Sequence, residues 1–437
     1  MIGLPDFVRR HRRKILVATG IAATGYLLVD YIKSKFFELQ DRLATERAAR
    51  ENLKRRFEQN QQDATFTIMA LLPSLGSQMS SQFPVEKTTA ELQAKRTERA
   101  SSKQMIESTE TMSDSLPSVS SVASSVVRDD GEDNKPRKSK TELWSELKTQ
   151  SLSRAFTLVY SSALLVFFTR LQLNILGRKN YVMSVVQMAD KKPSGHQITM
   201  ENLADSDMAS LALEEEELHT NRMYLTFSWW LLNKGWVALS ERIRDAVVQV
   251  FDPINPRKEL TLAEFSELIG RVQFAIDHPS EQTTQSNFLH NLLPPQELES
   301  YVLAQAPSDG DGTRPNNFVD ATLRRLLDET ADFIESPNAV DVIHKLVHSG
   351  LSVFVGRVAT LYPAEDFSGT PTENPSKVKL ASILANVSKQ AQGMTSGSPF
   401  EPNEYITAMI DVPDLDGFSA LVYSNFDWAN LGIHSQV

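Results

Sequence analysis

His344 and His348 stand four positions apart, which is the spacing of two metal ligands on one face of a helix. A zinc protease with this spacing carries its catalytic glutamate directly after the first histidine. Lys345 occupies that position here, so the sequence lacks the general base of such an enzyme. We therefore interpret the two histidines as structural and predict no metal site.

A second candidate for metal binding is the segment 309–313, where aspartate and glycine alternate as at the start of a calcium loop. Such a loop needs glycine at its sixth position and glutamate at its twelfth, where this chain has Arg314 and Asp320. We therefore expect a flexible turn. Glycine-rich phosphate loops, a GxSxG elbow and cysteine are absent from the sequence. Because no nucleophile, base and oxyanion site come together, we predict that the protein is not an enzyme and uses no cofactor.

The chemistry that remains is that of protein recognition, and it lies in a helix predicted to begin at residue 140. Leu143, Trp144 and Leu147 fall on neighbouring positions of one helix face, and Lys140 and Lys148 lie one turn to either side of the tryptophan. Apolar anchors with a basic rim suit an amphipathic partner helix that carries acidic residues. The alternative is that Trp144 packs into the core. Its position in the first turn after a polar tract favours exposure.

Composition limits the class of protein to which this recognition helix belongs. The chain has 437 residues, of which 41% are hydrophobic, enough for a sizeable core in one large or two medium domains. Its net charge of −10 makes it a poor binder of phosphate groups, so we predict no nucleic-acid partner. The absence of cysteine fits a body in a reducing compartment such as the cytosol.

The N-terminal 32 residues are typical of a short basic tail followed by a membrane span. Residues 15–32 measure about 27 Å as a helix, which reaches across the hydrocarbon of a bilayer. A cleaved signal peptide fits less well, because a long chain without cysteine argues against secretion, and an amphipathic helix would not be apolar all round. Five basic residues precede the span and five follow closely, so charge does not decide its orientation. The apolar residues of this anchor are Ile15, Leu16, Val17, Ile21, Leu27, Leu28 and Val29, and its basic flank is Arg9, Arg10, Arg12, Arg13 and Lys14.

Beyond the span, mixed charge with a thin apolar stripe predicts a solvated helix over 33–62 that continues to residue 72 and ends before Pro73. Residues from about 97 to 138 are rich in serine and charge, and we predict a disordered insertion there. Ser139 and Glu142 then form a capping box for a helix predicted over 140–176. Its middle, 155–169, holds no charge. Fifteen residues are short for a second membrane span, so we expect a helix buried in the core.

The rest of the chain reads as a series of helices. Apolar residues at alternating spacings of four and three predict one helix over 223–250, in which Gly235 costs about 1 kcal/mol relative to alanine. A capping box of Thr261 and Glu264 begins another that ends near residue 276. Proline and glycine positions predict further helices over 319–335, 339–361, 377–392, 404–412 and 415–430. We predict an all-α protein, with a tail over 1–14, a transmembrane anchor over 15–32, and an elongated bundle of long helices in a cytosolic domain over 33–437.

Several motifs, in order along nearly the whole chain, resemble those of the peroxin-3 family in its fungal form. They are the basic block before a single span, LLPSL at 71–75, LWSELK at 143–148, RLQLNIL at 170–176, LTFSWWLLNKGW at 225–236 and VYSNF at 422–426. The resemblance implies a docking receptor in peroxisome membrane biogenesis. It further implies an anchor in the lipid of the peroxisomal membrane, with the N-terminus in the lumen and the helical body in the cytosol.

The same resemblance implies a partner, peroxin-19, the soluble carrier of newly made peroxisomal membrane proteins. In the family, a groove at the membrane-distal end of the bundle binds an amphipathic helix of peroxin-19. Its central tryptophan matches Trp144, its neighbours match Leu147 and Lys140, and a further groove leucine matches Leu92. With Leu143 and Lys148, these residues make up the predicted groove. The alternative is a receptor or tether on another organelle, such as the mitochondrial outer membrane.

Overall fold

The computed structural model describes residues 50–110, 138–190, 215–278, 288–306, 318–363 and 376–425. The predicted tail, its basic flank and the anchor over 15–32 lie outside these residues, as do segment 309–313 and residues 111–137 of the predicted insertion. The chain divides into two compact units, Met1–Asn60 and Gln61–Val437. Residues 50–60 of the first unit are helical and partly or fully exposed, as predicted for a solvated helix. The second unit is a bundle of helices.

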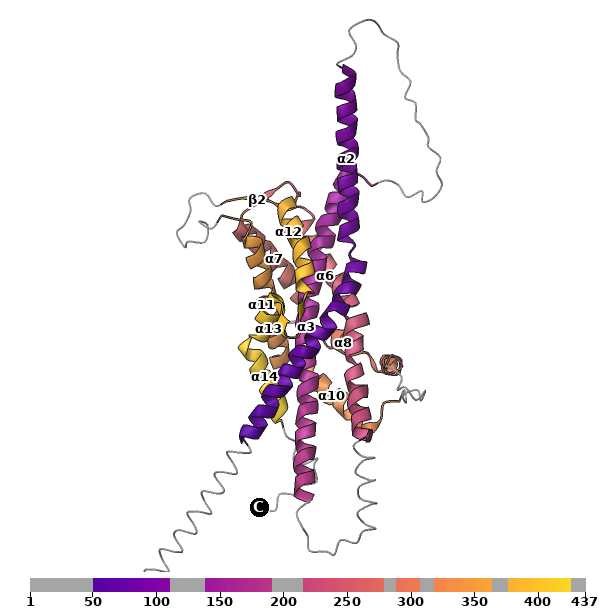
Figure 1. The fold of residues 1–437 in the computed structure, drawn as a ribbon, viewed down its shortest axis with the longest axis vertical. Helices are drawn as coiled ribbons and strands as arrows, with labels where there is room; N and C mark the ends of the chain where they lie inside the picture. The colour runs from indigo at the N-terminus through magenta and orange to yellow at the C-terminus, as the bar shows by residue number, and fades with distance from the viewer. Residues whose placement is uncertain are drawn as a thin grey trace, which may run out of the picture. The chain divides into compact units, whose positions relative to one another are not determined.

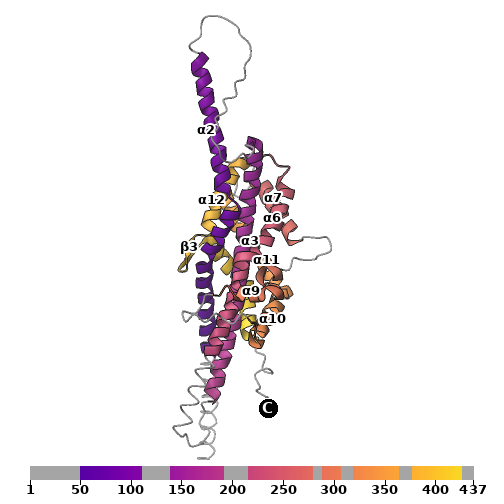
Figure 2. The same ribbon diagram turned by 90° about the vertical axis from the view of Figure 1, so that its right-hand side faces the viewer.

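Helix α3 (Lys140–Asp190) forms the centre of this bundle, as both ribbon views show (Figures 1 and 2). It starts at the predicted capping box: the Ser139 amide donates to the Glu142 carboxylate at 2.7 Å, and the Glu142 amide donates to the Ser139 hydroxyl at 3.2 Å. Among the described residues, α3 is also the one helix long and apolar enough to cross a membrane. Its most apolar stretch is wholly buried inside the bundle, which supports the prediction of a core helix.

Other helices surround α3 and bury their apolar stripes against it. They include α2 (Val85–Glu110), α6 (Trp236–Phe251), α10 (Ala321–Glu335), α11 (Pro337–Ala359), α12 (Leu380–Met394), α13 (Glu404–Ile410) and α14 (Pro413–Ser424). Helix α7 (Leu262–Asp277) packs on α6 and begins at the predicted capping box of Thr261 and Glu264. Shorter elements complete this part of the chain: α8 (Leu289–Leu292), η2 (Gln296–Leu298) and α9 (Glu299–Leu303). The prediction of a mostly helical protein is confirmed for the described residues.

The described residues also contain very short strands, which were not predicted from the sequence. β1 (Glu259–Leu260) pairs antiparallel with β2 (Val378–Lys379), and β3 (Gly397–Ser398) pairs with β4 (Glu401–Pro402). Each strand has two residues, too few for an alternating pattern to appear. The β1–β2 pair helps to position α12, because β2 leads directly into this helix.

The helix predicted over 223–250 is interrupted. Residues 215–226 are helical, a turn at Phe227 follows, and then α5 (Ser228–Trp230) leads into η1 (Leu231–Gly235), a turn of π-helix that precedes α6. The break lies where α8 approaches: a Cβ atom on Gly235 would sit 1.9 Å from the Asn291 carbonyl oxygen. The Asn291 side chain also donates to the Gly235 carbonyl at 2.8 Å. Gly235 is therefore required by a close backbone approach, not merely tolerated.

Several predicted boundaries were wrong. Helix α3 continues to Asp190, past the end predicted at residue 176. The helix through 61–82 does not end before Pro73, because residues on both sides of the proline, such as Leu72 and Leu75, are buried in the main core and hold the helix in place. Helix α2 continues to Glu110, so the predicted disordered insertion does not begin at residue 97. Extending a helix that is already packed requires no new nucleation, which permits helix even where little apolar surface is available.

Candidate protein-binding groove

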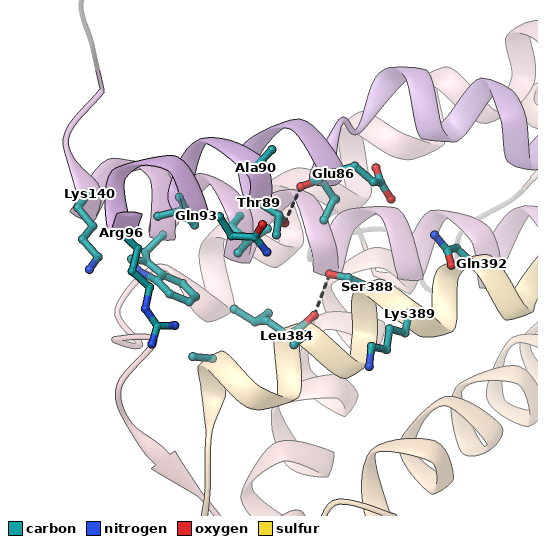
Figure 3. Close-up of a pocket in the computed structure, with 16 residues that line it drawn as sticks. Glu86, Thr89, Ala90, Gln93, Arg96, Lys140, Leu384, Ser388, Lys389 and Gln392 are labelled. Carbon is teal, nitrogen blue, oxygen red and sulfur yellow. Dashed lines mark hydrogen bonds between the residues drawn. The ribbon is translucent and has the colours of Figure 1, made fainter. Parts of the chain in front are cut away.

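A groove of about 840 Å³ lies between α2, α3 and α12 (Figure 3). Two helices form its walls, and the first turns of α3 lie between them. Wall α2 contributes Val85, Glu86, Thr89, Ala90, Leu92, Gln93 and Arg96, α3 contributes Lys140, Trp144 and Leu147, and wall α12 contributes Ala381, Leu384, Ala385, Ser388, Lys389 and Gln392. A trough walled by helices has the form of sites that accept one further helix.

The floor of the groove is apolar and belongs to a small cluster of its own. Leu92 of α2 is buried with Leu143 and Leu147 of α3, and Trp144 packs against them half-buried. This cluster is separate from the main core of the bundle. The structure thus brings predicted residues Leu92, Trp144 and Leu147 together at one surface. Leu143 is 1% exposed and supports the floor from behind without lining the groove.

The rim of the groove is basic. Arg96, Lys140 and Lys389 are exposed and come from three different helices. Figure 3 shows Arg96 and Lys140 at the same end of the cavity. The carboxylate in the lining, Glu86, is engaged by a buried arginine, Arg154. The predicted rim lysine Lys140 is therefore in place, and Arg96 and Lys389 are rim cations that were not predicted from the sequence.

Lys148, the other predicted rim residue, does not line the groove. Its side chain is buried, and its ammonium donates to the carbonyl oxygens of Phe251 at 2.7 Å, Asp252 at 3.1 Å and Ile254 at 3.0 Å. These carbonyls lie at the C-terminal end of α6 and just after it, where backbone acceptors have no partner four residues further along a helix. Burial lowers the pKa of Lys148, and the nearby charge of Asp252 opposes this shift. Lys148 therefore donates hydrogen bonds to backbone carbonyls at the end of α6 and does not form part of the rim.

The wall α12 is held at its N-terminus by the loop that Lys148 secures. The amides of Leu380 and Ala381 donate to the carbonyls of Lys258 and Pro256, both at 2.9 Å. Next to these bonds, β2 pairs with β1 in the register Leu260 to Val378. The end of α6, the loop after it and the start of α12 therefore form one connected structure behind the groove.

Arg154 joins both walls of the groove to α3. It is 2% exposed, and its guanidinium donates to the Glu86 carboxylate of α2 at 2.7 Å and to the Ser388 carbonyl of α12 at 3.2 Å. Burial raises the pKa of Glu86, but its hydrogen bonds and the charge of Arg154 outweigh this and leave the pKa below its usual value. This role was not predicted from the sequence. Its signal was a charge at the edge of an uncharged, buried helix segment, where a cation needs a partner.

The two histidines predicted to be structural do not converge on a common site. His344 is half-buried, and its Nε2 lies 3.6 Å from a carboxylate oxygen of Asp277, which also accepts a hydrogen bond from the Tyr160 hydroxyl at 2.8 Å. His348 lies exposed one turn further along α11. Within the described ranges, no group of three or more histidine, aspartate or glutamate side chains is placed to hold a metal ion.

Comparison with known proteins shows which family the chain as a whole resembles. The family model described as Peroxin-3 matches residues 6–425. "Peroxisomal biogenesis factor 3" of Yarrowia lipolytica is 51% identical over 97% of this chain and 100% of its own length. "Peroxisomal membrane protein PEX3" of Komagataella phaffii is 32% identical over 96% of this chain and 98% of its own. A rat "Peroxisomal biogenesis factor 3" is 25% identical over 96% of both chains.

Proposed function

The chain belongs to the peroxin-3 family of non-enzymatic peroxisome biogenesis factors, and from that premise we propose that it is a docking receptor for peroxin-19. An amphipathic helix of peroxin-19 binds in the groove between α2, α3 and α12 and brings newly made membrane proteins to the organelle. The receptor performs no catalytic step. Its contribution is to hold the carrier at the membrane for as long as delivery takes.

The observation that carries this proposal is the setting of Trp144. The indole lies half-buried in an apolar floor at the base of a helix-walled trough. An aromatic anchor in an apolar groove is typical of the residues that dominate binding energy. A partner helix would complete the burial of Trp144 and cover the neighbouring Leu92 and Leu147.

The rim indicates the charge of the partner. Three exposed cations, Arg96, Lys140 and Lys389, surround a groove whose carboxylate is already engaged by Arg154. A bound helix would therefore present acidic side chains on both flanks of its apolar face. Rim charges of this kind chiefly speed association and select among partners.

We further propose that residues 15–32 anchor the protein in the peroxisomal membrane, with residues 1–14 in the lumen and the helical body in the cytosol. The sequence supports a span of the required length and apolarity. The name of the Komagataella relative, "Peroxisomal membrane protein PEX3", supports the organelle. In this arrangement the groove faces the compartment in which a soluble carrier circulates.

Substituting Trp144 with alanine tests the docking proposal. We expect full-length protein in lipid nanodiscs to bind a labelled peptide of the peroxin-19 helix, and Trp144→Ala to weaken binding by at least about 2 kcal/mol, or roughly thirtyfold, because a central aromatic anchor is lost. Fluorescence anisotropy measures the dissociation constant.

The matched control is Trp229→Ala, since Trp229 is also a half-buried tryptophan but packs against Tyr301 outside the groove. Its effect on peptide binding should be small. A loss below about 1 kcal/mol for Trp144→Ala, or an equal loss for both variants, would contradict docking at this groove.

A further inference from the structure

The two walls of the groove have few means of holding their distance from each other. Both α2 and α12 pack mainly on α3, and the groove separates them. Helix α12 is part of the main core, through residues such as Leu384 and Val387. The described side chains of α2 instead reach the body through the small cluster of Val85, Leu92, Leu143 and Leu147. Wall α2 is therefore the less firmly held of the two.

Polar contacts near the start of α2 help the small apolar cluster to hold this helix against α3. The Thr88 hydroxyl donates to the Gln150 side chain of α3 at 3.0 Å. The guanidinium of Arg154 then reaches both walls at once, with one nitrogen on Glu86 and another on the Ser388 carbonyl. The Ser388 hydroxyl also lies 3.3 Å from the Ser151 hydroxyl of α3. Glu86 and Ser388 both line the groove, whereas Arg154 lies behind it.

We propose that Arg154 is a positioning residue that sets the separation of α2 and α12 and so keeps the groove open in the form a partner helix requires. A guanidinium is planar and presents its donors in a fixed fork, so two bonds from one group define a distance in a way that a flexible ammonium cannot. Arg154 itself is buried, so water does not readily replace a bond that its guanidinium loses. Arg154 itself would touch no partner.

This inference deepens the proposed function, on which its consequence for binding rests. A groove held ready for its ligand saves the cost of ordering α2 on binding. Loss of the arginine should therefore leave the apolar floor intact but weaken binding, because the partner would first have to bring the wall into place. The separation of the walls can be measured without any partner present.

The test exploits the absence of cysteine from the chain. Ala94→Cys on α2 and Ser382→Cys on α12 introduce two nearly isosteric, exposed attachment points outside the groove lining. Spin labels at these points in the full chain report the distribution of α2–α12 distances by electron resonance. We expect a narrow distribution in the parent and a clearly broader or shifted one in Arg154→Gln and in Glu86→Ala.

Glu86→Ala keeps the test open if Arg154→Gln fails to fold, because Glu86 is largely exposed and its loss removes the α2 bond alone. The matched control is Arg170→Gln, a second buried arginine of α3, which pairs with Asp416 of α14 outside the groove. It should disturb the fold to a similar degree and leave the α2–α12 distances unchanged. Folded Arg154→Gln or Glu86→Ala protein with the parent distribution would overturn the proposal, as would equal broadening in Arg170→Gln.

A second measurement separates this proposal from the docking function. We expect Arg154→Gln to weaken binding of the peroxin-19 peptide about tenfold, with Arg170→Gln close to the parent. If Trp144→Ala leaves peptide binding unchanged, docking at the groove is wrong, while a changed wall distance would still support the role of Arg154. If Trp144→Ala weakens binding and Arg154→Gln alters neither distance nor affinity, the role assigned to Arg154 is wrong and docking stands.

Discussion

Two buried cations of α3 hold the surroundings of the groove in different ways. The Lys148 ammonium binds three carbonyl oxygens at the end of α6, a task for a compact group with three donors. The Arg154 guanidinium spans two helices, a task for a wide and rigid fork. Each residue type matches the geometry of its acceptors, so neither should be replaceable by the other.

Lys148→Met should lower the free energy of unfolding by about 2–4 kcal/mol, since methionine retains the apolar stem but removes the ammonium that donates to three carbonyl oxygens. Of these three, the Phe251 oxygen keeps the Ile254 amide as a donor, at 3.0 Å. Urea titration of the full chain in detergent micelles measures the effect. The exposed Lys140→Met is the control and should change stability by less than about 0.5 kcal/mol. Similar values for the two variants would contradict the role assigned to Lys148.

His344 should make stability depend on pH. Burial lowers the pKa of its imidazole below the usual 6.5; the Asp277 charge opposes this shift and the His278 charge adds to it. Below about pH 6.5 the unfolded chain therefore binds a proton that folded His344 does not, and stability falls as the pH falls. His344→Gln should flatten this dependence by up to about 1.4 kcal/mol per pH unit between the lowered pKa and 6.5.

Urea titrations at a series of pH values from 5.5 to about 7.5 would record the slope. His348→Gln, which changes the exposed histidine one turn along the same helix, is the matched control. An unchanged slope in His344→Gln would show that this imidazole binds its proton equally in both states.

At the scale of elements, the π-turn η1 and helix α8 form one joint, because the backbone of Asn291 rests on Gly235. Helix propensity alone predicts that Gly235→Ala stabilises the protein by about 1 kcal/mol. The contact between Gly235 and Asn291 predicts instead that Gly235→Ala destabilises the protein. A methyl group 1.9 Å from a carbonyl oxygen forces the backbone of α8 to move, and such overpacking typically costs about 1–3 kcal/mol.

Thermal or urea unfolding shows directly whether Gly235→Ala stabilises or destabilises the protein. Gly270→Ala in α7 and Gly356→Ala in α11 are the controls, since an added Cβ at either position meets no atom within 4 Å. Both should be neutral or stabilising by up to about 1 kcal/mol. Stabilisation by Gly235→Ala as well would mean that α8 does not pack against η1 in solution.

Elements defined by local rules were predicted well. The capping boxes at Ser139 and Thr261 begin α3 and α7, because a cap depends on residues three positions apart. The floor residues Trp144 and Leu147 were found for the same reason, as they share a helix face. Arg154 could not be found in this way, since its partners lie 68 and 234 positions away in the chain.

Arg154 was missed by the sequence analysis, whereas Lys148 was wrongly predicted to lie on the rim of the groove. Its spacing from Trp144 was right for a rim residue, but the end of α6, which is far away in the sequence, lies against it and takes up its charge. The break at Gly235 was missed because it depends on the backbone of α8. Local pattern thus predicts where helices begin and which face is apolar. Contacts between distant segments decide which polar groups remain available for a partner.

At the scale of the whole molecule, the proposed function requires the groove and the predicted membrane anchor together. Residues 1–45 fused to a fluorescent protein should reach peroxisomes in yeast cells, because this segment holds the predicted span and the basic residues around it. Microscopy with peroxisomal and mitochondrial markers measures the location. The control carries Leu27→Asp and Leu28→Asp, which place two charges in the span and should leave the fusion dispersed. Accumulation on mitochondria would favour a receptor of that organelle instead.

The order in which the groove's parts occur along the chain has a consequence for the protein's synthesis. Two of its three sides come from residues 85–96 and 140–147, and the third comes from residues 381–392. A ribosome that has translated three quarters of the message has produced the tryptophan-bearing helix but not the wall that faces it. If the groove is the docking site that we propose, the nascent chain has no complete site at that stage, and we expect it to bind its partner only when translation is nearly finished.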